Sequence, residues 1–206
     1  MVHKQKIIGL VGFISSGKNT VADIISNDYG YQKLSFADSL KSAVSSIFNW
    51  DRELLEGITE ESRAFREKKD EWWSNKLGKS VTPRWVLQYM GTEVLRNNFH
   101  NDIWIMSILK KIETNPTTNF IITDTRFINE IKAIESIGGS IIRVKRGNDP
   151  VWFEDAKLGQ GQMIAKHPTI HESEWNWIQA EPKIIINNDG SITDLMVETK
   201  KVLKEI

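Results

Sequence analysis

The residues best suited to chemistry lie in one short loop, Gly12-Phe13-Ile14-Ser15-Ser16-Gly17-Lys18-Asn19-Thr20. An apolar run precedes the loop and a helical pattern follows it, so several backbone N–H groups converge there and the helix dipole adds positive charge. Gly12 and Gly17 permit the turns that this requires, and Lys18 can reach the terminal phosphates of a nucleotide. The pattern therefore predicts a site for ATP, lined by Gly12, Ser15, Ser16, Gly17, Lys18, Asn19 and Thr20.

The loop departs from the usual G-x-x-x-x-G-K-[ST] pattern at the residue after the lysine. That residue is Asn19, so the hydroxyl that would help to hold Mg²⁺ is displaced by one position to Thr20. A threonine two places after the lysine resembles the loop of adenylate-kinase-like nucleotide kinases. The alternative is a glycine turn with a solvated lysine, and the strand and helix patterns on either side argue against it.

An acidic and a basic residue follow a second apolar run, at 120–123. Asp124 and Arg126 stand at the carboxyl end of this predicted strand, where open α/β sheets bind ligands. Asp124 can hold magnesium or its waters, and Arg126 can meet a phosphoryl oxygen. The alternative is a capping aspartate and a surface arginine.

Other basic residues could neutralise phosphates elsewhere. A cluster at 63–69 contains Arg63, Arg66, Lys68 and Lys69, and Arg84 begins a later helical pattern. Arginine suits bidentate phosphate contacts, so these residues could hold the phosphate of an acceptor, although such a run is also typical of a solvated face.

Arg143 and Arg146 lie on and just after the apolar run at 141–144. We favour Arg146 for contact with the transferring phosphoryl group, because the end of a strand points into the crevice. Trp104 has the spacing of a helical core residue, with base stacking as the alternative. The segment His171-Glu172-Ser173-Glu174 lacks metal-ligand spacing, so we interpret it as a latch for a flap.

The elements that must position these residues alternate between two periods. Apolar runs at 7–12, 120–123, 141–144 and 183–186 predict buried parallel strands, and the less apolar segment 31–36 predicts an edge strand. Helical patterns lie between them, with Ser191 to Asp194 spaced as a capping box before the last helix. The pattern predicts an α/β fold with a parallel sheet flanked by helices.

Two stretches interrupt this alternation within what we interpret as a single domain, 1–206. Residues 37–118 contain helical patterns and no convincing strand, with Asp38 as a candidate cap and Thr82-Pro83 as a helix start, so they predict a helical insertion. Residues 147–182 have no clean period and predict a mobile flap, or lid. The core is then 1–36, 119–146 and 183–206.

Composition excludes several classes of protein. The chain has 206 residues, of which 40% are hydrophobic, with 27 basic and 27 acidic side chains and no cysteine. A net charge of zero argues against a nucleic-acid partner, and the absence of cysteine removes disulfides and thiolate chemistry. No apolar run is long enough to cross a bilayer, so we expect a soluble cytoplasmic protein with no membrane partner. Asn75-Lys76-Leu77-Gly78 lacks the acid of a guanine-binding motif, which argues against a GTPase.

Several motifs in their order along the chain resemble the deoxynucleoside monophosphate kinases of tailed bacteriophages, within the adenylate-kinase-like P-loop kinases. The resemblance rests on the loop at 12–20 and on 36–41, 87–93, 97–99, 123–126 with Glu130, and 187–191. It implies a five-stranded parallel sheet, a helical monophosphate-binding insertion and a lid. It also implies phosphorylation of deoxynucleoside monophosphates by ATP, with Mg²⁺, in a host cytoplasm and in a possible homodimer.

The resemblance implies an acceptor site formed by Lys41, Arg63, Arg84, Gly91, Thr92, Trp104, Asp124, Arg126 and Glu130. The charged run around Arg63 permits an alignment slip of one residue. Adenine would lie near Asn188, and Mg²⁺ near Thr20 and Asp124. Because a monophosphate is already ionised at neutral pH, positioning by Lys18 and charge neutralisation by Arg126 and Arg146 would be sufficient.

Two other functions fit parts of the pattern. A dephospho-coenzyme A kinase or a nucleoside kinase phosphorylates a hydroxyl and needs a carboxylate base, and Asp38 stands near the expected position. A non-catalytic regulator would bind ATP and form no phosphorylated product.

Overall fold

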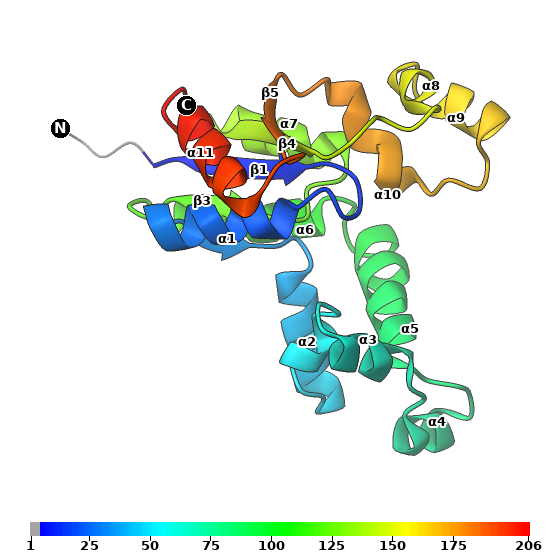
Figure 1. Cartoon of the computed structure of the whole chain (residues 1–206). Coiled ribbons are helices and arrows are strands. Elements are labelled where there is room, and N and C mark those ends of the chain that lie inside the picture. The colour runs from blue at the N-terminus through cyan, green and yellow to red at the C-terminus, as the bar shows by residue number, and fades with distance from the viewer. Residues whose placement is uncertain (1–4) are drawn as a thin grey trace. The chain divides into compact units, whose positions relative to one another are not determined.

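A computed structural model describes residues 5–206, which form two compact units (Figure 1). The first unit comprises the described part of 1–35 together with 111–206, and the second comprises 36–110. The first unit contains β1 (Ile7–Val11), α1 (Lys18–Tyr29), β2 (Gln32–Leu34), β3 (Phe120–Ile122), α7 (Ile128–Ser136), β4 (Ser140–Lys145), α8 (Phe153–Lys157), α9 (Gln160–Lys166), α10 (Glu172–Trp175), η3 (Asn176–Ala180), β5 (Ile184–Asn187) and α11 (Ile192–Leu203).

The five strands form one parallel sheet in the order β2-β3-β1-β4-β5. This confirms the predicted parallel sheet and places the segment predicted as an edge strand at an edge. β1 lies between β3 and β4, with Ile8 opposite Ile121 on one side and Ser140 on the other. The loop at 12–20, which is predicted to bind phosphates and is called the phosphate loop below, follows β1 and therefore leaves the middle of the sheet beside the residues that follow β3.

Helices cover both faces of the sheet. On one face, side chains of α1 and α11 pack with the strands in a buried cluster that includes Ile8, Leu10 and Ile142. Gly9 faces the other way because neighbouring strand residues alternate. A Cβ at Gly9 would come within 2.8 Å of Ile134 in α7, so α7 lies close against that opposite face.

Local capping fixes the ends of several helices. Ser191 and Asp194 form the predicted capping box, and Thr82 accepts a hydrogen bond from Trp85 N at the start of α5. Each satisfies backbone donors that a helix start leaves free. Asp38 is the first helical residue of α2, and the preceding residue, Ala37, is the cap, so the expected cap is wrong by one position.

Residues 147–182 are more regular than the sequence indicates. They form α8, α9, α10 and η3, whereas we expected a flap without periodic structure. These helices are four to seven residues long, which is too short for a helical period to stand out. Buried Ala156, Met163, Trp175, Trp177 and Ile178 give the segment apolar packing of its own.

The second unit is helical, as its sequence predicts. Its elements are α2 (Asp38–Phe48), η1 (Glu53–Leu55), α3 (Glu60–Glu67), α4 (Glu71–Leu77), α5 (Pro83–Gln88), η2 (Tyr89–Asn97) and α6 (Ile103–Glu113), the last of which ends in the first unit. η2 is a π-helix that follows α5 directly. π-helical turns are rare and occur frequently at functional sites.

Candidate active site

The phosphate loop approaches its neighbours too closely for any residue but glycine at two positions. Gly12 has φ 142°, and a Cβ there would lie 2.4 Å from the backbone oxygen of Val144 in β4. Gly17 has φ 99°, and a Cβ there would lie 2.2 Å from Nδ2 of Asn188. Positive φ is also costly for other residues. The two glycines therefore let the loop pass tightly over β4 and under Asn188.

Lys18 lies across this loop with its amine directed at the loop backbone. Its Nζ donates hydrogen bonds to the carbonyl oxygens of Gly12 at 2.7 Å and Phe13 at 2.9 Å. Burial lowers the pKa of Lys18 to about 8, and the charge of Arg126 acts in the same direction, whereas Glu174 opposes it. The charges of Arg126 and Glu174 therefore both act on the Lys18 amine, in opposite directions. A further negative charge, added to that of Glu174, would relieve the repulsion between Lys18 and Arg126.

The hydroxyl of Ser16 is an unused polar group inside the loop. Ser16 is 4% exposed, and its Oγ has no hydrogen-bond partner within residues 5–206. Buried hydroxyls are normally hydrogen-bonded, so this orphaned group fits a site that receives phosphate oxygens.

Oxygen donors suited to Mg²⁺ follow the loop and β3. Thr20 is half-buried in the first turn of α1, and the carboxylate of Asp124 accepts a hydrogen bond from Ser35 Oγ at 2.7 Å. Hydroxyl and carboxylate oxygens are the ligands that Mg²⁺ prefers, so the donor set fits this ion. Within residues 5–206, no group of three or more His, Cys, Asp or Glu side chains could hold a metal by itself.

Asn188, which directly follows the edge strand β5, holds the phosphate loop in place. Its Nδ2 donates to Ser16 O at 2.9 Å, and its backbone N donates to Lys145 O in β4. The side chain therefore holds the loop in place, whereas we expected a contact with the nucleotide, which stays a prediction.

Arg126 begins a turn that is organised by a buried carboxylate. Glu130 is 4% exposed, and its Oε2 accepts from the backbone N of Arg126 at 2.8 Å and of Phe127 at 3.0 Å. The side chain of Arg126 is 47% exposed and lies 3.4 Å from Glu174. In this geometry Glu130 positions Arg126. A contact of Glu130 with the acceptor stays a prediction.

The base of the 147–182 segment is fastened to this turn. Asn176 Oδ1 accepts from Ile128 N at 2.7 Å, and its Nδ2 donates to Glu172 at 2.7 Å. His171 caps α10 by accepting from Ser173 N through Nδ1. These contacts fit the interpretation of 171–174 as a latch, but the sequence did not reveal Asn176, because an isolated asparagine carries no spacing signal.

Two arginines on β4 and just after it differ in environment. Arg146 is exposed, as a residue available to a phosphoryl group must be. Arg143 is 6% exposed and forms an ion pair with Asp149.

In the second unit, the predicted acceptor residues occupy several environments. Lys41 Nζ lies 2.6 Å from Glu56, whose carboxylate also pairs with Arg52. Burial by itself raises the pKa of Glu56, but hydrogen bonds from Lys41 and Arg52 bring it below the usual value. The ammonium of Lys41 is thus held by a carboxylate that stays ionised.

Gly91 and Trp104 pack against each other. Trp104 is 8% exposed, and its Nε1 donates to Gly91 O at 3.1 Å. A Cβ at Gly91 would lie 2.7 Å from Leu40. The geometry is that of a core tryptophan, and base stacking stays a prediction. The next residue, Thr92, is exposed on the π-helix.

The three arginines predicted for the acceptor phosphate or close to it in sequence differ in burial. Arg63 is exposed, and Arg84 pairs with Glu67 at 2.6 Å. Arg66 donates to Glu56 O at 3.4 Å, and its Nε is buried without a hydrogen-bond partner within residues 5–206. Burial lowers the pKa of Arg66, and the charge of Arg84 acts in the same direction. Arg66 is therefore a further candidate for the acceptor phosphate beside Arg63, and its buried, unsatisfied Nε favours Arg66.

A family model for deoxynucleotide monophosphate kinase matches residues 52–199 of this chain. This chain belongs to the deoxynucleotide monophosphate kinase family. The family match begins after the phosphate loop, so the loop geometry and the family assignment are separate observations.

Two curated relatives carry the same description. The chain is 32% identical over 154 residues to a putative deoxynucleotide monophosphate kinase of Acanthamoeba polyphaga mimivirus, covering 68% of this chain and 74% of the relative. It is 25% identical over 256 residues to the deoxynucleotide monophosphate kinase of Enterobacteria phage T4, covering 97% and 99%.

Among solved structures, the chain is similar to a dephospho-CoA kinase from Campylobacter jejuni. The TM-score is 0.51 at 16% identity, covering 98% of this chain and 97% of that one. At this identity the likeness concerns the fold alone, and it is the fold predicted from the sequence.

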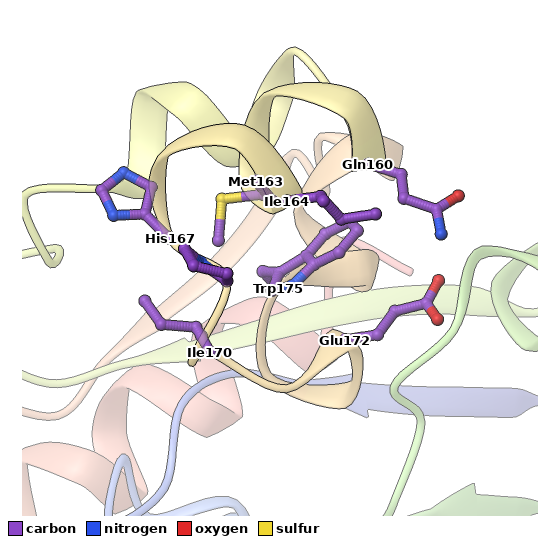
Figure 2. Close-up of a pocket in the computed structure, with 8 residues that line it drawn as sticks. Gln160, Met163, Ile164, His167, Ile170, Glu172 and Trp175 are labelled. Carbon is purple, nitrogen blue, oxygen red and sulfur yellow. The ribbon is translucent and has the colours of Figure 1, made fainter.

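A pocket in the first unit lies outside the predicted site. A pocket of about 170 Å³ is lined by Gln160, Met163, Ile164, His167, Pro168, Ile170, Glu172 and Trp175. Figure 2 shows these side chains around the pocket. None of the residues predicted for nucleotide binding lines this pocket.

Within residues 5–206, no helix has the length and apolar character needed to cross a membrane.

Proposed function

We propose that the protein transfers the terminal phosphoryl group of ATP to a deoxynucleoside monophosphate, giving ADP and the diphosphate. The observation that carries this proposal is the phosphate loop itself. Lys18 and the orphaned hydroxyl of Ser16 lie in a loop that follows the central strand β1, and the charge of Arg126, which follows the neighbouring strand β3, acts on Lys18. Membership of the family, and the names of its curated relatives, support the choice of acceptor.

The chemistry needs charge neutralisation more than proton transfer. An oxygen of the acceptor phosphate attacks the terminal phosphorus of ATP, and the bond from that phosphorus to the bridging oxygen breaks as ADP leaves. Because the acceptor phosphate has a second pKa near 6, the attacking oxygen is already ionised at neutral pH. No catalytic base is required, and in-line positioning with stabilisation of charge accounts for the acceleration.

The site residues predicted in the first unit then have distinct roles. Lys18, Ser16 and the backbone N–H groups of the loop hold the phosphates of ATP, and Asn188 keeps the loop in shape. Arg126 and Arg146 neutralise charge on the transferring group. Mg²⁺, bound through Thr20 and Asp124 or their waters, would supply further neutralisation of the phosphate oxygens.

The second unit would hold the acceptor. Lys41, Arg84 and either Arg63 or Arg66 supply positive charge for its phosphate, and Thr92 presents a hydroxyl from the π-helix. Substrates and products are free nucleotides, and we propose that the protein acts in the cytoplasm of a host cell, as its phage relatives suggest.

The test is an ADP-release assay with Mg-ATP and a panel of acceptors: dAMP, dCMP, dGMP, dTMP, AMP, deoxynucleosides and dephospho-coenzyme A. We expect turnover with one or more deoxynucleoside monophosphates and its loss in Lys18→Ala. Product identity is confirmed by chromatography of the diphosphate.

One variant and one binding measurement separate the alternatives. Asp38 lies in α2 and pairs with Arg52 at 3.3 Å, so Asp38→Asn removes a candidate base with little change in volume. A phosphate acceptor predicts a small effect on turnover, and a hydroxyl acceptor predicts a large one. ATP binding without turnover on any acceptor would overturn the proposal in favour of a regulator.

A further inference from the structure

Arg143 is a buried cation that the proposed chemistry does not use. It lies within β4, is 6% exposed, and is paired with Asp149, which is itself partly exposed. Its Nε has no hydrogen-bond partner within residues 5–206. A buried guanidinium with an unsatisfied donor destabilises a fold unless other contacts compensate, so its surroundings need an explanation.

Three aromatic rings surround this guanidinium. The Arg143 Cζ atom lies 4.6 Å from the ring centroid of Phe153, 5.4 Å from that of Trp177 and 5.9 Å from that of Phe13. The rings also contact one another, with centroids 5.2 Å apart for Phe13 and Trp177 and 6.2 Å apart for Phe13 and Phe153. Cations over aromatic faces are attracted by the ring quadrupole, most strongly where water is excluded.

The rings come from two segments that the site requires. Phe13 is the second residue of the phosphate loop, and its carbonyl oxygen accepts from Lys18 Nζ at 2.9 Å and from Ser16 N at 3.2 Å. Moving Phe13 would therefore move both the lysine and the loop turn. A direct path thus leads from the guanidinium to the residue that receives ATP phosphates.

Trp177 connects the same guanidinium to the other segment. Its Nε1 donates to Glu174 O at 3.0 Å, and the carboxylate of Glu174 lies 3.4 Å from Arg126. Phe153 begins α8, so the rings of Phe153 and Trp177 both belong to the 147–182 segment. Loop and segment thus meet on one side chain.

We propose that Arg143 is a positioning residue, which couples the conformation of the phosphate loop to the base of the 147–182 segment without touching substrate. The proposal rests on the proposed function only in that the loop binds ATP. Replacing the guanidinium releases Phe13 from Trp177 and Phe153, so ATP affinity falls. The replacement also loosens the base of the 147–182 segment near Arg126. Water then reaches ATP more easily, so the ratio of ATP hydrolysis to phosphoryl transfer rises.

The experiment compares Arg143→Met, Arg143→Lys and the matched control Lys145→Met. Lys145 lies on the same strand and pairs with the same Asp149 at 3.4 Å, whereas no ring contact joins it to Phe13, Phe153 or Trp177 in the structure. ATP affinity is measured by calorimetry without acceptor. KM for each substrate, the ratio of hydrolysis to transfer, and thermal unfolding are measured in parallel.

We expect Arg143→Met to weaken ATP binding by about tenfold and to raise the ratio of hydrolysis to transfer, with KM for the monophosphate at saturating ATP changed less than about twofold. Arg143→Lys keeps the charge and loses the planar face, so it should recover only part of the affinity. Lys145→Met should match the wild type in all of these measurements.

A structural role alone would lower the unfolding temperature and the active fraction, and would leave ATP affinity and the hydrolysis ratio of the folded protein unchanged. That result overturns the proposal. If Arg143→Met does not fold, a double-mutant cycle of Arg143→Lys with Phe13→Leu replaces it. Effects on ATP affinity that are less than additive support coupling, and additive effects overturn it.

The proposed function can fail independently of this inference. Wild-type protein that binds ATP and phosphorylates no acceptor would end the kinase assignment, while the calorimetric comparison of Arg143→Met with Lys145→Met would still decide the coupling.

Discussion

Lys18 illustrates how the environment of one side chain can tune a generic phosphate-binding residue. Its amine is held by two carbonyl oxygens, yet burial and the neighbouring charge of Arg126 lower its pKa to about 8 from a usual 10.5. In the free protein the charged form is therefore less favoured than in water. Phosphates restore the balance by adding negative charge, so ATP binding should draw a proton onto Lys18 at mildly alkaline pH.

We predict that ATP affinity falls by about tenfold between pH 7 and pH 9, because one proton with a pKa near 8 must be present for binding. Below pH 8 the amine is already charged, and above pH 8 binding must take up the proton. Calorimetry in two buffers of different ionisation enthalpy measures that uptake. Lys18→Arg keeps its charge throughout this range and should show a flat profile, and an equally steep profile in this variant would assign the proton elsewhere.

A second prediction concerns the acceptor phosphate. Arg66 is half-buried with an unsatisfied Nε and Arg63 is exposed. We expect Arg66→Met to raise KM for the deoxynucleoside monophosphate by at least tenfold, with KM for ATP little changed, because a charged hydrogen bond to phosphate is lost. Arg63→Met is the matched control on the same helix, with an expected change below threefold. The reverse order would restore Arg63 as the phosphate ligand.

At the scale of elements, a single carboxylate joins two of the short helices of 147–182, α8 and α9. Asp155 in α8 accepts hydrogen bonds from Gln162, Lys166 and His167 in and after α9. These three bonds hold the pKa of Asp155 well below its usual range. α8 and α9 are too short to be stable alone, so such contacts are needed to keep them in place.

We therefore expect Asp155→Asn to loosen α8 and α9 without unfolding the sheet. Hydrogen exchange should become several-fold faster over 153–167 and stay unchanged in α11, because local opening requires only the local contacts. Glu154→Gln, which removes an exposed pair with Lys157 in the same helix, serves as control. Faster exchange in α11 as well would mean that the segment does not open independently.

On the scale of the whole molecule, the chain is divided between two compact units, with the phosphate loop in one and most of the predicted acceptor residues in the other. The second unit lies between β2 and β3 in the sequence, whereas all five strands of the sheet belong to the first unit. The proposed function then gives each unit a different ligand, ATP for the first and the monophosphate for the second.

This assignment predicts two separate protection patterns. A non-hydrolysable ATP analogue should slow hydrogen exchange at 12–20 in the first unit, and a deoxynucleoside monophosphate should slow it at 84–97 in the second, because bound ligands stabilise the segments that contact them. Lys18→Ala should abolish only the first pattern. Protection by the monophosphate confined to the first unit would contradict the assignment of the acceptor.

Much of the fold follows from local sequence. Four apolar runs and the less apolar segment 31–36 predict the five strands, and the lower apolar content of 31–36 predicts its edge position, because the burial of a strand is reflected in its consecutive residues. Thr82 and Ser191 mark helix starts for the same local reason. The short helices of 147–182 could not be predicted, because four to seven residues contain at most two turns of the helical period.

The sequence by itself determined the phosphate loop, the strands and the order of the family's motifs, since each depends on residues that are neighbours in the chain. Only the tertiary structure decided which charges are buried together. It placed Arg143 among three rings from distant segments, Asn188 on Ser16, and Arg126 close enough to lower the pKa of Lys18. Desolvation and Coulomb interaction depend on distance in space, and separation along the chain does not encode that distance.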